Sequence, residues 1–290
     1  MFINDRLVYL EMQKTASQHI DFLLDKYVGG RQLGHHTQLV GDHGGRFTIG
    51  SVRNPWDWYV SLWAYGCLGK GSLHEALTGG RIVRLKQAAS DLKPFPLRLL
   101  GKAAGLIGEQ RREAWQSVYA DAGEPRLFRQ WLKDILGGPA QADMIEGYPQ
   151  SSLSRFAGFM TFRYVRLYVR YGAWRKSILT IRDENQLADL LSAHGVLDHA
   201  IRMECLEEDF IEALRLAGYE VDATMSAAIH DEKKQGTNKS KHNDADFYYD
   251  RETADLVADR DRLIINLYGY NNPLEPRESA TGESRRCSAA

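Results

Sequence analysis

The sequence predicts an α/β protein of three layers, in which helices flank both faces of a parallel sheet. Three segments carry this prediction, two near the N-terminus and one in the C-terminal third. Each pairs a short run of apolar, β-branched and aromatic residues with a following repeat of apolar residues at helical spacing, which is the pattern of βα units. The stretch between them is helical and irregular, so we expect it to be an insertion in the sheet domain.

The first unit begins with residues 6–12 (RLVYLEM), a short apolar run that predicts a buried strand. The polar residues 13–17 follow as a turn. Apolar side chains then recur at helical spacing until Gly29 and Gly30, which end the predicted helix.

The second unit is marked more clearly. Residues 46–52 (RFTIGSV) predict a second strand. Asn54 is a favoured N-cap residue and Pro55 suits the first helical position, so a helix is predicted to begin there and to end near Gly66.

The C-terminal third returns to the same alternation. Residues 200–204 predict a strand, 206–217 a helix, and 250–268 a last helix. We therefore expect a single domain followed by a small, polar tail that is disordered. The boundaries that we assign are 1–270 for the domain, 1–66 and 198–270 for its core, about 67–197 for the mostly helical insertion, and 271–290 for the tail.

The charge of the chain is balanced overall but uneven along its length. The 290 residues include 37 lysines and arginines against 38 aspartates and glutamates, a net charge of −1. Residues 81–182 alone hold 18 basic and 8 acidic side chains, a net charge of +10. This asymmetry argues against a polycation that binds nucleic acid with its whole surface and favours a local anionic partner.

Cysteine spacing and hydropathy limit the cellular setting. The cysteines at 67, 205 and 287 show no CxxC or metal-ligand spacing, so no metal site is expected. No apolar run is long enough for a transmembrane helix, and the first residues lack the features of a signal peptide. We expect a cytoplasmic protein.

The turn after the first predicted strand carries candidate anion-binding groups. A helix N-terminus that follows a parallel strand offers free N–H groups and partial positive charge to a phosphate. The full P-loop motif is absent, and an ordinary strand–helix turn with a surface lysine is the alternative interpretation. The residues that we single out are Lys14, Thr15, Ala16, Ser17 and Gln18.

A second candidate pair lies in the next unit. Arg53 ends a strand, and Ser61 follows on the helix face that begins beside it, at the i+7 position from Asn54. A guanidinium and a hydroxyl there could hold a second phosphate. The alternative is an N-cap ion pair from Arg53 and a solvent-facing serine.

Together these two segments resemble the sulfotransferases that use 3′-phosphoadenosine 5′-phosphosulfate (PAPS), especially the carbohydrate-type, Golgi-like members and their bacterial relatives. The family's PKT[GA][ST][ST] loop is similar to QKTASQ at 13–18, and its RxPxxxxxS segment to RNPWDWYVS at 53–61. Segments at 201–210 and 238–270 look like the family's closing elements. Two positions depart from the pattern, because Gln13 replaces a proline and Gln18 a second hydroxyl.

The resemblance implies a P-loop-NTPase-like sheet and transfer of a sulfuryl group from PAPS to a hydroxyl acceptor, without a metal. Lys14 would stabilise the leaving phosphate, and Arg53 and Ser61 would anchor the nucleotide. Its implied general base is a histidine between the first helix and the second strand, best matched by His36. His35 and then His43 are its competitors, and a surface histidine in a loop is the alternative. Residues implied to fold over the nucleotide are Lys239, Ser240 and Lys241.

A basic, aromatic stretch at 155–182 completes the candidates. Arg163, Arg166 and Arg170 are predicted to share one helical face, where guanidinium groups could bind an anionic glycan or glycolipid acceptor. A solvated basic helix is the alternative, and nucleic acid is a lesser one. For the whole chain, the competing functions are a P-loop-like nucleotide-dependent kinase and a catalytically silent nucleotide- or anion-binding protein of the same fold.

Overall fold

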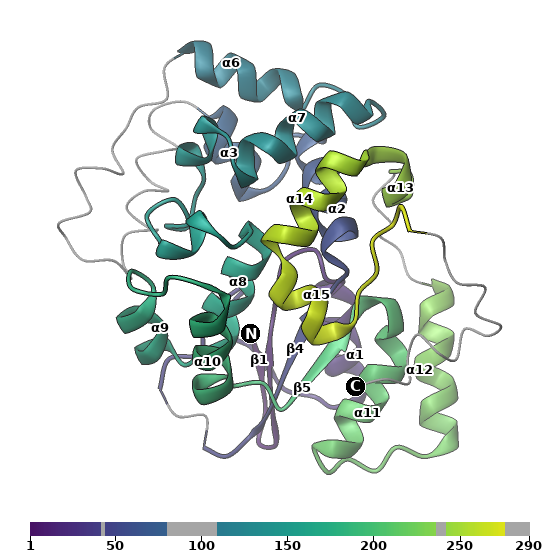
Figure 1. The fold of residues 1–290 in the computed structure, drawn as a ribbon. Helices are drawn as coiled ribbons and strands as arrows, with labels where there is room; N and C mark the ends of the chain where they lie inside the picture. Colours follow the sequence, from purple (N-terminus) through teal and green to yellow (C-terminus); the bar gives the residue numbers. More distant parts are fainter. Residues whose placement is uncertain (42–43, 80–108, 236–241, 276–290) are drawn as a thin grey trace.

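The computed structural model describes residues 1–41, 44–79, 109–235 and 242–275 (Figure 1). Its sheet has the order β3-β1-β2-β4-β5. The strands are β1 (Phe2–Ile3), β2 (Leu7–Leu10), β3 (Arg31–Gln32), β4 (Phe47–Val52) and β5 (His199–Arg202). Strands β2, β4 and β5 are parallel, as predicted, and they are the three strands that the sequence pattern identified.

The prediction of a wholly parallel sheet is wrong at one edge. Strand β1 pairs antiparallel with β2, and β3 pairs antiparallel with β1, so the sheet is mixed. The reversal between β1 and β2 is a tight turn in which the side chain of Asn4 accepts hydrogen bonds from the backbone N–H groups of Arg6 and Leu7. Strands of two residues are too short to show a period in the sequence.

Helices cover both faces of the sheet because side chains alternate along its strands. Leu7 and Tyr9 of β2 pack with α1 (Ser17–Tyr27) and α11 (Leu206–Leu216). Val8 and Leu10 point to the opposite face and pack with α2 (Pro55–Cys67). Helix α12 (Ala223–Gln235) lies outside α11 (Figure 1).

The connections after β2 and β4 leave the sheet in opposite directions. Helix α1 follows β2 onto one face, whereas α2 follows β4 onto the other. In open α/β sheets, ligands bind at the carboxyl ends of neighbouring strands where the connections diverge in this way. The topology therefore marks the ends of β2 and β4 as the place to look for a site.

The described part of the middle of the chain is helical, as predicted, and shares its hydrophobic core with α2. Trp63 of α2 contacts Phe128 with ring centroids 5.4 Å apart, and Trp58 contacts Phe159 at 6.2 Å. The helical elements described there are α3 (Ser72–Thr78), α6 (Glu109–Val118), α7 (Pro125–Leu136), the 3₁₀ helices Pro139–Asp143 and Ser152–Arg155, α8 (Phe159–Tyr168), α9 (Tyr171–Ser177) and α10 (Glu184–His194).

The predicted last helix is interrupted. A short helix, α13 (Ala245–Tyr248), precedes α14 (Arg251–Arg260) and α15 (Arg262–Tyr268), and Asp261 separates the last two. The buried carboxylate of Asp261 accepts hydrogen bonds from the Tyr59 hydroxyl at 2.7 Å and from the N–H and hydroxyl of Thr161 at 2.8 and 2.7 Å. These contacts join α2, α8 and the C-terminal helices. The spacing of apolar residues in the sequence cannot predict them.

Within the described ranges, no helix combines the length and the apolar character that crossing a membrane requires. The predicted disordered tail falls mostly on residues 276–290, which lie outside the described residues.

Candidate anion-binding and transfer site

The loop from Glu11 to Ala16 joins β2 to α1 at the carboxyl end of the sheet. Lys14 and Ala16 both have left-handed backbone conformations, with φ of 64° and 59°. Ala16 is the N-cap of α1 and its side chain makes no capping bond, and the first turn of the helix has no acidic residue. A helix N-terminus whose first turn has neither a side-chain cap nor an acidic residue suits an anion.

Lys14 and Arg53 meet at the ends of β2 and β4. The Nη1 of Arg53 donates a hydrogen bond to the backbone carbonyl of Lys14 at 3.4 Å. The Nζ of Lys14 lies 4.1 Å from the ring centroid of Tyr65. Burial, and second the charge of Arg53, lower the pKa of Lys14 to about 8. Among the described residues, neither cation forms an ion pair with a carboxylate.

Acidic groups near Arg53 lie beyond ion-pair distance and have other partners. The carboxylate of Glu204 accepts a hydrogen bond from the backbone N–H of Asn54 at 2.7 Å and another from the Tyr270 hydroxyl at 3.3 Å. Burial lowers the pKa of Arg53, although Asp57 and Glu204 act in the opposite direction. The two cations therefore remain less compensated than is usual for partly buried charges.

The predicted hydroxyl ligands of the loop behave differently from one another. Thr15 is fully buried, its hydroxyl donates to the Met12 carbonyl at 2.7 Å, and it lies 2.6 Å from Oγ of Ser51. Thr15 thus fixes the loop against β4 rather than facing outward. Ser17 at the start of α1 is partly exposed, and Gln18 is exposed.

Ser61 is not brought to the surface beside Arg53. It lies within α2 and is only 2% exposed. The alternative prediction of a solvent-facing serine is therefore wrong, and the structure does not place the Ser61 hydroxyl at the exposed edge of the loop. The predicted N-cap of this helix is confirmed, because the Asn54 side chain accepts a hydrogen bond from the N–H of Trp56 at 3.0 Å.

His36 is held with one nitrogen free. Its Nδ1 lies 3.2 Å from the backbone carbonyl of Glu11, and its backbone N–H donates to the Glu11 carboxylate at 3.2 Å. A carbonyl can only accept, so Nδ1 carries the proton and Nε2 keeps its lone pair. Burial lowers the pKa of His36, helped by the charge of Arg163 and opposed by Glu11. This tautomer suits a proton acceptor.

Glu11 is the centre of a second cluster that the sequence did not reveal. It is 1% exposed, and both of its carboxylate oxygens lie 3.0 Å from Nδ1 of His35. Burial and the neighbouring Glu11 carboxylate raise the pKa of Asp21 to about 7. One ligand atom from each of Glu11, Asp21 and His35 lies within 4.8 Å of the others, so this group could hold a metal ion.

The arginines of α8 are largely engaged inside the protein. Glu146 accepts hydrogen bonds from Arg163 at 3.3 Å, with a second, shorter contact, and from Arg166 at 2.8 Å. Arg163, which is 4% exposed, also bonds to the side-chain oxygen of Gln13. The two arginines share a helical face, as predicted. Arg170 does not, because α8 ends at Tyr168.

Gln13, which replaces the proline of the resembling motif, ties the loop to the insertion. Its backbone carbonyl accepts a hydrogen bond from Nε1 of Trp58 at 2.7 Å, in addition to the contact between its side chain and Arg163. One signal could have indicated the cluster around Glu11, because this residue is an acid inside an apolar run. Predicted residues that lie outside the described part of the chain are His43, Lys239, Ser240 and Lys241.

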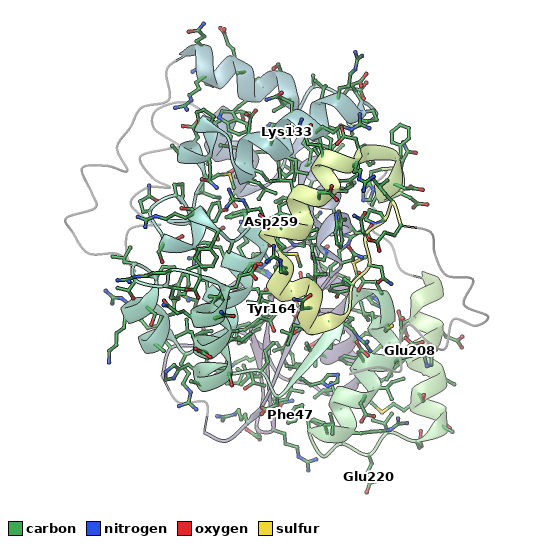
Figure 2. All side chains as sticks on the ribbon, in the orientation of Figure 1. Phe47, Lys133, Tyr164, Glu208, Glu220 and Asp259 are labelled. Carbon is green, nitrogen blue, oxygen red and sulfur yellow. The ribbon has the colours of Figure 1, made fainter. Side chains whose placement is uncertain are left out.

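A separate cavity of about 380 Å³ lies along β5, and neither Lys14 nor His36 lines it. Tyr164 of α8, labelled in Figure 2, borders this cavity, and its hydroxyl lies 2.6 Å from that of Tyr268 in α15. Lys14, Arg53 and His36 therefore all lie outside this cavity. No family model, curated protein or solved structure matches this chain.

Proposed function

We propose that this chain is a sulfotransferase that moves a sulfuryl group from PAPS to a hydroxyl acceptor, with a P-loop-like arrangement of its nucleotide site. The observation that carries the proposal is the meeting of Lys14 and Arg53 at the ends of two parallel strands, beside a helix N-terminus without a side-chain cap. Two partly buried cations that form no ion pair with a described carboxylate are costly unless an anion binds them.

We infer the kind of anion from the two cations and from the two different strands that they follow. Lys14 belongs to the loop after β2, and Arg53 follows β4, so the site presents cations from two directions. PAPS and its product 3′,5′-ADP carry phosphates at two separate positions of one ribose. Lys14 with the N-terminus of α1 would hold the 5′ side, and Arg53 the 3′-phosphate.

The transfer requires a bond exchange at sulfur and the removal of one proton. The S–O bond to the 5′-phosphate breaks as a new S–O bond forms to the acceptor hydroxyl. The phosphate keeps the bonding electron pair, and Lys14 stabilises its added negative charge. The acceptor proton passes to Nε2 of His36, which is the nitrogen that the Glu11 carbonyl leaves free. Each residue thereby has one role in positioning or charge transfer.

The arginines of α8, rather than the Glu11 side of His36, support an anionic acceptor, such as a carboxylated or sulfated glycan. Arg163 and Arg166 share the single carboxylate of Glu146, so this group keeps one net positive charge. Arg166 is 24% exposed and is the member that could meet a ligand. Arg163 instead holds Gln13, and we assign it to positioning the loop.

Binding measurements separate this proposal from its competitors. Isothermal titration calorimetry should show that 3′,5′-ADP binds at least tenfold more tightly than ADP or ATP–Mg²⁺. Lys14→Ala and Arg53→Ala should each weaken the binding of 3′,5′-ADP by tenfold or more. Lys70→Ala, which removes an exposed lysine, is the matched control and should bind normally.

Transfer is then measured with labelled PAPS and glycosaminoglycan oligosaccharides as acceptors. His36→Gln should lower turnover at least a hundredfold while it leaves 3′,5′-ADP binding unchanged. Preference for ATP–Mg²⁺ over 3′,5′-ADP would favour the kinase. Tight 3′,5′-ADP binding without transfer to any acceptor of the panel would favour the catalytically silent protein.

A further inference from the structure

Glu11, Asp21 and His35 come from three different elements and converge at the end of β2. Glu11 follows β2, Asp21 lies in α1, and His35 follows β3. The Glu11 side chain is almost completely buried, whereas the His35 side chain is 66% exposed. The group is therefore anchored in the protein on one side and open to solvent on the other.

One oxygen in this group has no donor. Oδ1 of Asp21 is buried and has no hydrogen-bond partner among the described residues, although Oδ2 accepts a bond from the Gln32 amide at 3.0 Å. Buried polar atoms in proteins nearly always have a partner. A carboxylate oxygen with no donor beside a second buried carboxylate indicates that a proton or a metal cation belongs between them.

The neighbouring groups do not supply enough positive charge. The N-terminal ammonium of Met1 lies 3.5 Å from the Glu11 carboxylate, and the backbone N–H of His36 also donates to it. When both carboxyl groups are ionised, this ammonium offsets only one of their two negative charges. A metal ion would bind a nitrogen of His35 in place of the hydrogen bond that its Nδ1 makes with Glu11.

We infer that Glu11, Asp21 and His35 form a binding site for a divalent transition-metal ion, of which Zn²⁺ and Mn²⁺ are the best candidates. Two carboxylate oxygens and one imidazole nitrogen are ligands that both ions accept, whereas Mg²⁺ and Ca²⁺ prefer oxygen alone. Three protein ligands leave a coordination position open, on the side where His35 meets solvent.

The site has a structural consequence that does not depend on the proposed sulfuryl transfer. An ion there joins the segment after β3 to the end of β2 and to α1. The same segment contains His36, whose position depends on Glu11. Metal binding would thus fix the histidine segment on the carboxyl edge of the sheet.

The test uses the full chain without an affinity tag, treated with EDTA and dialysed into buffer at pH 7.5. Calorimetric titration with ZnCl₂ and with MnCl₂ should show one bound equivalent, and thermal melting should shift upward by several degrees. Asp21→Asn and His35→Gln should each weaken the binding by tenfold or more. MgCl₂ should not reproduce either effect.

Two matched variants control for adventitious surface sites. Asp25→Asn changes an exposed acid on the same helix, and His230→Gln removes a histidine that lies near Glu208 on the surface. Both should bind the metal as the wild type does. Circular dichroism of each variant shows whether it is folded, and Co²⁺ absorption reports whether nitrogen ligation disappears in His35→Gln.

Two results would overturn the inference. The first is metal binding that is absent, or that Asp21→Asn and His35→Gln leave unchanged. The second is an Asp21→Asn variant that melts higher than the wild type in EDTA while neither protein responds to metal. That outcome would show that a proton shared between the two carboxyl groups occupies the place assigned to the ion. Neither result bears on whether 3′,5′-ADP binds at Lys14 and Arg53.

Discussion

Two regions of this molecule are rich in cationic side chains, but they differ in whether a described carboxylate pairs with those side chains. At the ends of β2 and β4, Lys14 and Arg53 adjoin each other without forming an ion pair with a described carboxylate. On α8, Arg163 and Arg166 enclose the carboxylate of Glu146, whose pKa these guanidinium groups hold below its usual value despite burial. The cations of the first region have no ion-pair partner among the described residues, whereas those of the second share a carboxylate.

The difference separates charge that can bind a ligand from charge that stabilises the fold. The stretch at 81–182 holds the excess positive charge of the sequence, and it suggested an anionic acceptor. In the structure, Arg163 of that stretch is engaged with Glu146 and Gln13. The loop at Lys14 lies in the acidic remainder of the chain, yet it is the loop at which we propose that an anion binds. Local pairing, rather than net charge, decides which cations are available.

The largest effect on stability is expected from removing the carboxylate that Arg163 and Arg166 share. Glu146→Gln removes the shared carboxylate and leaves Arg163 buried without a counter-ion, so we expect the free energy of unfolding to fall by about 3 kcal/mol. Urea denaturation followed by tryptophan fluorescence measures this loss. Glu113→Gln, which changes an exposed acid, is the control and should stay within about 0.5 kcal/mol of the wild type. A loss below about 1 kcal/mol for Glu146→Gln would show that the α8 pair contributes little.

At Lys14, by contrast, we expect a substitution to increase the free energy of unfolding. Lys14→Met keeps the aliphatic stem and removes a charge that burial disfavours, so we expect the ligand-free protein to gain about 1 to 3 kcal/mol at pH 7. The gain should shrink above about pH 8, because the folded wild type then releases this proton while its unfolded state retains it. The variant should lose affinity for 3′,5′-ADP. A destabilised Lys14→Met would contradict the idea that this charge is costly without a ligand.

Local sequence rules predicted most of the elements that build the site. The second strand was predicted at 46–52 and is found at Phe47–Val52, and the cap of the next helix by Asn54 and Pro55 was confirmed. These features depend on neighbouring residues alone. The same holds for the loop at Lys14, because a polar turn between a strand and a helix is a local pattern.

The rest depends on contacts between distant residues. Asp261 interrupts a continuous helical repeat because it bonds to Tyr59 and Thr161, which are about one hundred or more positions away in sequence. Thr15 turns inward to Ser51, and Glu11 collects His35 and His36 from beyond the first helix. Residue type and spacing do not determine such partners. The loop was therefore predicted correctly from the sequence, whereas the direction of each side chain was not.

The smallest predicted effect compares lysine with arginine at the uncompensated position. Because the pKa of Lys14 is about 8, the free protein loses this charge as pH rises from 7 to 9, and the dissociation constant of 3′,5′-ADP should increase about tenfold over that range. The phosphates of the ligand stay fully ionised there, since their second pKa is near 6. Lys14→Arg retains a cation that does not titrate below pH ~12, so its dissociation constant should change little between pH 7 and 9. Equal pH profiles for the two proteins would show that Lys14 is not the titrating group. A profile that flattens only in Lys14→Arg would tie the pH dependence to the charge of Lys14, which forms no ion pair with a described carboxylate.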